Sequence, residues 1–229
     1  MECSFRPTNT EVLHVFTDVV EGAGGNVAQD GCDWDFLYLR ATLPDLAEVQ
    51  PGDPVRRGVA LTALNEYVCV SPYVFRVVCS NGQIMPEDVK DCSLRRMDAD
   101  SPVAEVTEWT LKFEEVIRAC LEPEIFTGAV ERMRAASKIL VRTWREALRH
   151  SLPGRVELPG LALEEAECRF DEGDDQSLYG MVNAITSTAR DEEDPELRWR
   201  LEELGGGVLA LVDSPLIKTD SAAAQPVMT

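Results

Sequence analysis

Residues that could carry acid–base, nucleophilic or metal chemistry are few and scattered. Only two histidines occur, His14 and His150, and no cysteine or acid stands near either at zinc-ligand spacing. A serine or cysteine nucleophile needs a histidine held beside it, and neither histidine lies in a Gly-x-Ser-x-Gly turn. His150 is expected at a helix end, where the helix dipole favours a positive charge. The sequence therefore predicts no catalytic residue and no metal ligand.

Acidic pairs are the other groups suited to acid–base catalysis or Mg²⁺ binding. They occur at Glu164-Glu165, at Asp174-Asp175 and between Asp191 and Asp194. Clustered acids in an acidic stretch are typical of a solvated segment. The glycine-rich run 22–25 follows a predicted helix and does not open one after a strand, so it indicates a helix end and not a phosphate-binding loop. We therefore predict a protein that is not an enzyme and that uses no cofactor.

Basic side chains gather in one place, against the overall composition. The chain has 22 Lys and Arg against 41 Asp and Glu, a formal net charge of −19. Between residues 131 and 150, however, six basic residues stand against two glutamates. Five of the six follow at intervals of three or four, which places them along one face of a helix. We call these five the basic stripe: Arg134, Lys138, Arg142, Arg145 and Arg149.

Two interpretations of the basic stripe stay open. An exposed, continuous stripe would follow the phosphate backbone of single-stranded nucleic acid, aided by Trp144 if that ring is exposed. Alternatively, the stripe pairs with the acidic segment 164–175 of the same chain. The acidic surface would then act on a partner protein, as an interaction module or a DNA mimic. Exposure of the stripe separates the two.

Composition predicts a globular protein. Hydrophobic residues make up 45% and charged residues 28%, and we expect a single α+β domain over residues 1–213. The tail 214–229 has too few apolar residues to fold and is expected to be disordered. No run of 18 apolar residues occurs, so no membrane association is expected. Seven irregularly spaced cysteines indicate reduced thiols and a cytoplasmic protein.

The N-terminal half is predicted to be a helix followed by strands. Apolar residues at helical spacing indicate a helix over 11–22, capped by Thr10. Branched and aromatic residues predict strands over 34–43, 57–64 and 67–79. Only two residues separate the last two strands, which favours a tight antiparallel hairpin.

The C-terminal half is predicted to be helical. Helices are expected over 102–122, 124–150, 176–190 and 195–204, with a solvated segment at 164–175. Pro123 separates the first two helices, and the glycines 205–207 are expected to stop the last. The predicted fold class is α+β: an N-terminal helix, an antiparallel β-meander of three or more strands packed by a long helix, and a helical C-terminal part.

The third strand ends abruptly in a compact polar sequence. Asn81-Gly82 tolerates positive φ and is expected to turn the chain out of the strand, while Cys79 is small enough to pack beneath the turn. We treat four residues here as a structural motif: Arg76, Cys79, Asn81 and Gly82.

This stretch resembles the R-x-V-C-S-N-G signature of a phage- and plasmid-related protein family of unknown function. The matching residues are Arg76, Val78, Cys79, Ser80, Asn81 and Gly82. Segments 58–63 and 178–186 also look like parts of that family, the second like its helical N-A-[IV]-T segment. The resemblance implies an association with mobile elements and no established activity.

Element order gives a looser likeness to the single-strand annealing proteins of phage recombination and double-strand-break repair, which is an analogy of fold. We therefore predict a non-enzymatic, nucleic-acid-associated protein of the mobile-element type. It would bind single-stranded DNA through the basic stripe, in DNA recombination, as a homo-oligomer or with a protein partner. The alternative is an acidic module that binds another protein.

Overall fold

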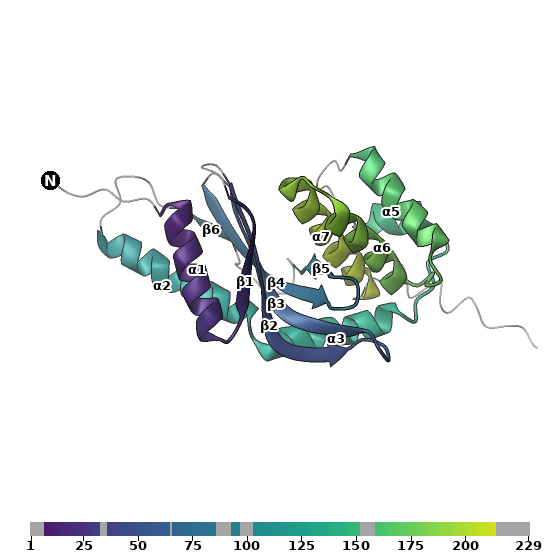
Figure 1. Cartoon of the computed structure of the whole chain (residues 1–229), viewed down its shortest axis with the longest axis horizontal. Coiled ribbons are helices and arrows are strands. Elements are labelled where there is room, and N and C mark those ends of the chain that lie inside the picture. The colour runs from purple at the N-terminus through teal and green to yellow at the C-terminus, as the bar shows by residue number, and fades with distance from the viewer. Residues whose placement is uncertain are drawn as a thin grey trace, which may run out of the picture.

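The computed structural model describes residues 7–32, 36–64, 66–85, 93–96, 103–151 and 159–213. Its strands are β1 (Asn26–Cys32), β2 (Phe36–Glu48), β3 (Pro54–Leu64), β4 (Tyr67–Arg76), β5 (Asn81–Ile84) and β6 (Ser93–Arg95). Its helices are α1 (Asn9–Gly22), α2 (Val103–Cys120), α3 (Pro123–Ala136), α4 (Trp144–Ser151), α5 (Gly160–Glu172), α6 (Leu178–Asp191), α7 (Pro195–Leu209) and the 3₁₀ turn η1 (Ala210–Asp213). The fold is α+β, with an N-terminal helix, an antiparallel sheet and a helical C-terminal part, as predicted (Figure 1).

The sheet is an antiparallel meander in the order β1-β2-β3-β4-β5, with β6 also paired to β4. Leu64 pairs with Tyr67, which confirms the two-residue connection between β3 and β4. Pro72 lies in β4 between the stretches that pair with β5 and β6. Its carbonyl accepts from Met85 N, and its missing N–H lies on that same side of β4, just beyond the residues that pair with β5.

The C-terminal boundary of β2 differs from the sequence prediction. This strand continues past Pro44 to Glu48, with an irregular register between Thr42 and Leu46 that absorbs the proline. The polar segment β1 shows no strand pattern and forms because it pairs with β2, with Asn26 opposite Thr42. Residue 34 and the predicted tail 214–229 lie outside the described residues.

Helices α1 and α2 cover one face of the sheet (Figure 1). Phe16 of α1 and Phe113 of α2 are fully buried against strand residues such as Leu61. The N-cap of α1 is Thr8 and not Thr10, because Thr8 and Glu11 form a reciprocal capping box. At the other end, α1 ends at Gly22 within the glycine run 22–25, as predicted.

Helix α7 packs against the opposite face of the sheet. Trp199 packs against Tyr38 with tilted rings whose centroids are 5.5 Å apart, and Glu202 forms an ion pair with Arg40 of β2. The prediction that glycines 205–207 stop this helix is wrong, since α7 continues to Leu209. Gly206 instead allows close approach to β5, where a Cβ would lie 1.8 Å from the Ile84 carbonyl oxygen.

The predicted long helix over 124–150 is two helices, α3 and α4. Helix α3 ends at Ala136, and α4 begins at Trp144. Between them, the Ile139 carbonyl accepts from Leu178 N, and Val141 N donates to the Gln176 carbonyl. This pairing with the start of α6 takes the backbone out of helical geometry, and sequence periodicity cannot detect it.

The acidic stretch predicted as a solvated segment is mostly helical. Helix α5 spans Gly160–Glu172, and its buried side is formed by Ala162, Ala166 and Phe170 at intervals of four. Its acids Glu164 and Glu165 are exposed on the other side. In the described part of the chain, no helix has both the length and the apolar character needed to cross a membrane.

Candidate functional site

The turn between β4 and β5 carries the predicted structural motif. Strand β4 ends at Arg76, and β5 begins at Asn81. The positive φ expected at Gly82 is found instead at Ser80, where φ is 53°. Gly82 is needed for another reason: a Cβ there would lie 2.2 Å from the hydroxyl oxygen of the buried Tyr73. The motif lies at a strand-to-strand turn, and the residue with positive φ in that turn is the serine.

Arg76 anchors this turn to a largely buried ionic network. Its Nε donates to Asp53 Oδ1 at 2.6 Å, and Tyr179 Oη donates to Asp53 Oδ2 at 2.9 Å. The guanidinium also lies over the Tyr179 ring, 5.7 Å from its centroid. Burial and then the charge of Asp53 raise the pKa of the Tyr179 hydroxyl, so it remains a neutral donor. The network joins the β2–β3 connection, β4 and α6.

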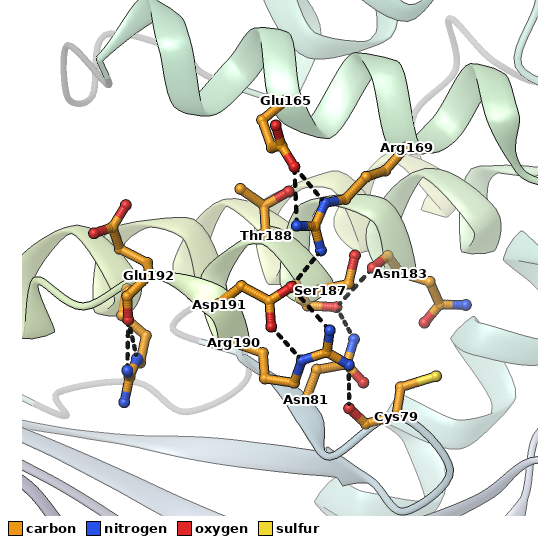
Figure 2. Close-up of polar contacts among 12 residues, drawn as sticks. Cys79, Asn81, Glu165, Arg169, Asn183, Ser187, Thr188, Arg190, Asp191 and Glu192 are labelled. Atoms are coloured by element: carbon orange, nitrogen blue, oxygen red, sulfur yellow. Dashed lines mark hydrogen bonds and ion pairs between the residues drawn. The ribbon is translucent and has the colours of Figure 1, made fainter.

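Two further contacts join the turn to α6. Asn81 Nδ2 donates to Thr186 Oγ1 at 2.6 Å, and Arg190 Nη1 donates to the Cys79 carbonyl at 2.9 Å (Figure 2). The segments 76–82 and 178–186 therefore meet in space although about a hundred residues separate them.

Arginines at the end of α6 and on α5 share one carboxylate. Arg190 Nε and Arg169 Nη1 donate to opposite oxygens of Asp191, at 2.7 and 2.8 Å (Figure 2). Arg169 also binds Glu165 at 2.9 Å. Hydrogen bonds from Arg190 and then Arg169 lower the pKa of the Asp191 carboxyl, which stays ionised. Sequence reasoning missed both arginines, although Glu165 and Arg169 stand at the i,i+4 spacing of a helical ion pair.

An open groove of about 560 Å³ lies between this turn, α5 and α6. We call it the β4–α6 groove. It is lined by Arg76, Cys79 and Asn81 of the motif, by Arg169 and Glu172 of α5, by Asp174 and Asp175 of the following turn, and by Asn183, Ser187 and Arg190 of α6. Three motif residues thus line the groove directly, and Gly82 lies beside it.

The residues that line the groove are mostly polar or charged. Arg76 Nη1 donates to Cys79 Sγ at 3.3 Å, but the lining residues include no histidine that could activate the thiol. Among the residues that the structure describes, no three His, Cys, Asp or Glu side chains are grouped to hold a metal ion. The polar side chains that line the groove provide hydrogen-bond donors and acceptors for a charged ligand.

The basic stripe is not one helical face. Arg134 lies on α3, Lys138 and Arg142 lie in the connecting segment, and Arg145 and Arg149 lie on α4. All five are nevertheless exposed. Trp144 is only 6% exposed and packs on Phe170, with ring centroids 5.3 Å apart, so it offers no stacking surface.

Two of the five stripe residues bind another residue in the described part of the chain. Arg134 donates twice to the Glu48 carbonyl, at 3.0 and 2.6 Å, and Arg145 lies 3.7 Å from Glu167 of α5. Lys138, Arg142 and Arg149 make no side-chain hydrogen bond or ion pair with any residue in the described part of the chain. The acidic stretch 164–175 therefore binds one member of the stripe and leaves the others accessible.

Comparisons with known proteins add no relative: no family model, no curated protein and no solved structure matches this chain. The geometry of the groove and of the exposed cations is thus the basis for any functional argument.

Proposed function

We propose that this protein is a non-enzymatic, nucleic-acid-associated protein of the mobile-element type. It binds the phosphate backbone of single-stranded nucleic acid with the basic stripe. One observation carries this proposal. Four exposed lysine or arginine side chains lack a partner among the described residues, and three of the four lie between residues 138 and 149; they are Lys112, Lys138, Arg142 and Arg149.

This concentration is unexpected in a chain with 41 acids and 22 basic residues. Several other exposed arginines pair with a carboxylate of their own chain, as Arg118 does with Glu114 and Arg190 with Asp191. Cations left unpaired beside one another repel, and an external polyanion relieves that repulsion while releasing its own counterions. The phosphate groups of a nucleic acid would neutralise these cations. Contacts to phosphates do not depend on the base sequence, so such binding would not be sequence-specific.

Two features limit the affinity of such a complex. The net charge of −19 repels nucleic acid at long range, and the buried Trp144 cannot stack on bases. Binding by one copy would therefore be weak and independent of sequence. Oligomerisation would place several stripes on one strand and raise the apparent affinity without new contacts.

Neutralising the unpaired cations tests the proposal. We expect the triple variant Lys138→Gln, Arg142→Gln, Arg149→Gln to bind a short oligothymidylate about tenfold or more weakly at low salt, measured by fluorescence anisotropy. The matched control removes three exposed cations elsewhere, by Arg95→Gln, Lys112→Gln and Arg118→Gln. Equal weakening in both triple variants would mean that only net charge matters, and would exclude the stripe as the binding surface.

The second candidate is an acidic module that binds a partner protein. The observation that favours it is the ion pair of Arg145 with Glu167, because it turns one stripe residue toward the acidic helix α5. Arg145 is 74% exposed, so this ion pair contributes little to stability. The two candidates differ in their ligand, and the oligothymidylate measurement separates them.

A further inference from the structure

The β4–α6 groove is lined by three arginines and three carboxylates, but only the arginines are neutralised by other residues in the described part of this chain. Its three arginines, Arg76, Arg169 and Arg190, are already bound to carboxylates of this chain. Its three rim carboxylates are exposed, and no lysine or arginine in the described residues pairs with them; they are Glu172, Asp174 and Asp175. The charge left uncompensated at the groove is therefore negative.

Helix geometry adds to this charge. Glu172 is the last residue of α5, and Asp174 and Asp175 follow directly. The carbonyl groups at a helix C-terminus carry a partial negative charge and favour a cation nearby. A positively charged ligand at this rim would thus be stabilised both by the carboxylates and by the helix end.

The groove also holds a buried acceptor without a donor. Asn81 lines it and is only 2% exposed. Its Nδ2 donates to Thr186, whereas its Oδ1 has no hydrogen-bond partner among the described residues. A buried acceptor left without a donor is unusual and costs stability. Ammonium and guanidinium groups are donors only, so they match both this oxygen and the rim carboxylates.

Two exposed apolar side chains are close to lining residues, one along the chain and one through a backbone bridge. Val78 is 58% exposed and precedes the lining residue Cys79, while Leu140 is 67% exposed and bridges to Ser177, two residues after Asp175. The aliphatic stem of a lysine or arginine side chain packs well on such surface while its charged end reaches polar groups.

We infer that the β4–α6 groove is a docking site for a lysine- or arginine-bearing segment of a partner protein. This goes beyond the nucleic-acid proposal, since it concerns another surface and a ligand of opposite charge. The chain would then join a nucleic acid at the basic stripe to a basic protein segment at the groove.

A capped hexalysine peptide is a suitable probe for this site. Titrated into ¹⁵N-labelled protein, it should shift the side-chain amide resonances of Asn81 and Asn183 and leave that of Asn9 on α1 unchanged. Affinity should fall as salt is added, because exposed charges are screened. Absence of binding at low salt, or shifts spread evenly over all three amides, would overturn the inference.

Matched charge variants distinguish docking from general attraction to an acidic chain. Glu172→Gln with Asp174→Asn should weaken hexalysine binding about tenfold. Glu105→Gln with Glu108→Gln removes two exposed acids from α2 and should change the affinity for hexalysine less than about twofold. Equal weakening in both pairs would overturn the inference. Oligothymidylate binding is not expected to fall in either pair, so failure of this inference and failure of the proposed function are distinguishable.

Discussion

Asp53→Ala is expected to lower the free energy of unfolding by about 3 kcal/mol, because it leaves the half-buried Arg76 guanidinium and the buried Tyr179 hydroxyl without their partner. Asp53 is 8% exposed and binds both Arg76 and Tyr179. Without it, the guanidinium keeps its charge in a low-dielectric site, and the Tyr179 hydroxyl loses its acceptor. The contacts between the β2–β3 connection, β4 and α6 would weaken together.

Urea unfolding of Asp53→Ala beside a control measures this effect. Asp45→Ala removes a carboxylate that also pairs with an arginine, Arg57, but Asp45 has a side chain that is 45% exposed. Exposed ion pairs contribute little, so this control should cost less than about 1 kcal/mol. Similar losses for the two variants would show that burial of the Asp53 network does not contribute to stability.

Gly206→Ala is expected to cost about 3 kcal/mol, at the upper end for overpacking a core, although alanine favours helices more than glycine does. The new Cβ would lie 1.8 Å from the Ile84 carbonyl oxygen and 2.9 Å from its carbon. Backbone cannot rotate away as a side chain can, so α7 must move from β5.

The neighbouring glycine provides the control for this variant. A Cβ at Gly207 would lie 3.3 Å from the Ser151 carbonyl oxygen, a tight contact but not an overlap. Gly207→Ala should therefore change stability by less than about 1 kcal/mol, since higher helix propensity offsets that contact. Thermal unfolding of both variants tests this. A Gly206→Ala protein as stable as the wild type would contradict the close packing of α7 on β5.

The sequence correctly predicted those helices and strands whose structure is determined by their own residues. The burial of Val12, Phe16 and Val20 at helical spacing defines α1, and the runs of branched and aromatic residues on either side of residues 65–66 define the β3–β4 hairpin. Pro123 was correctly predicted to separate α2 from α3. In each of these cases the sequence signal and the tertiary contacts favour the same local structure.

Tertiary contacts decided the elements that the sequence did not reveal. Apolar residues continue at helical spacing through 137–143, but backbone pairing with the start of α6 breaks the helix there. At Gly206 a helix-breaking residue sits inside a helix, because only glycine fits against β5. These outcomes depend on partners that are distant in sequence.

The candidate sites were predicted in part. The motif residues Arg76, Cys79 and Asn81 do line a groove, and the sequence pattern had marked them only as a strand end. The other charged residues that line the groove are Arg169, Arg190 and the acids of the turn after α5. They are distant in sequence from residues 76–82, so no local sequence pattern could show that they lie beside them. The basic stripe was predicted from helical spacing that the structure does not have. The five residues of the stripe are nevertheless exposed. That they form a binding surface remains a prediction.

The salt dependence of oligothymidylate binding tests the central claim most directly. Each phosphate contact with single-stranded nucleic acid contributes a slope of about 0.7 in a plot of log affinity against log salt. Contacts by Lys138, Arg142 and Arg149 alone therefore predict a slope of about −2, and about −3.5 if Arg134 and Arg145 also exchange their partners for phosphates. A slope in this range, which flattens in the triple variant, would support the proposed function. No binding at low salt, by any oligomer that the protein forms, would contradict it.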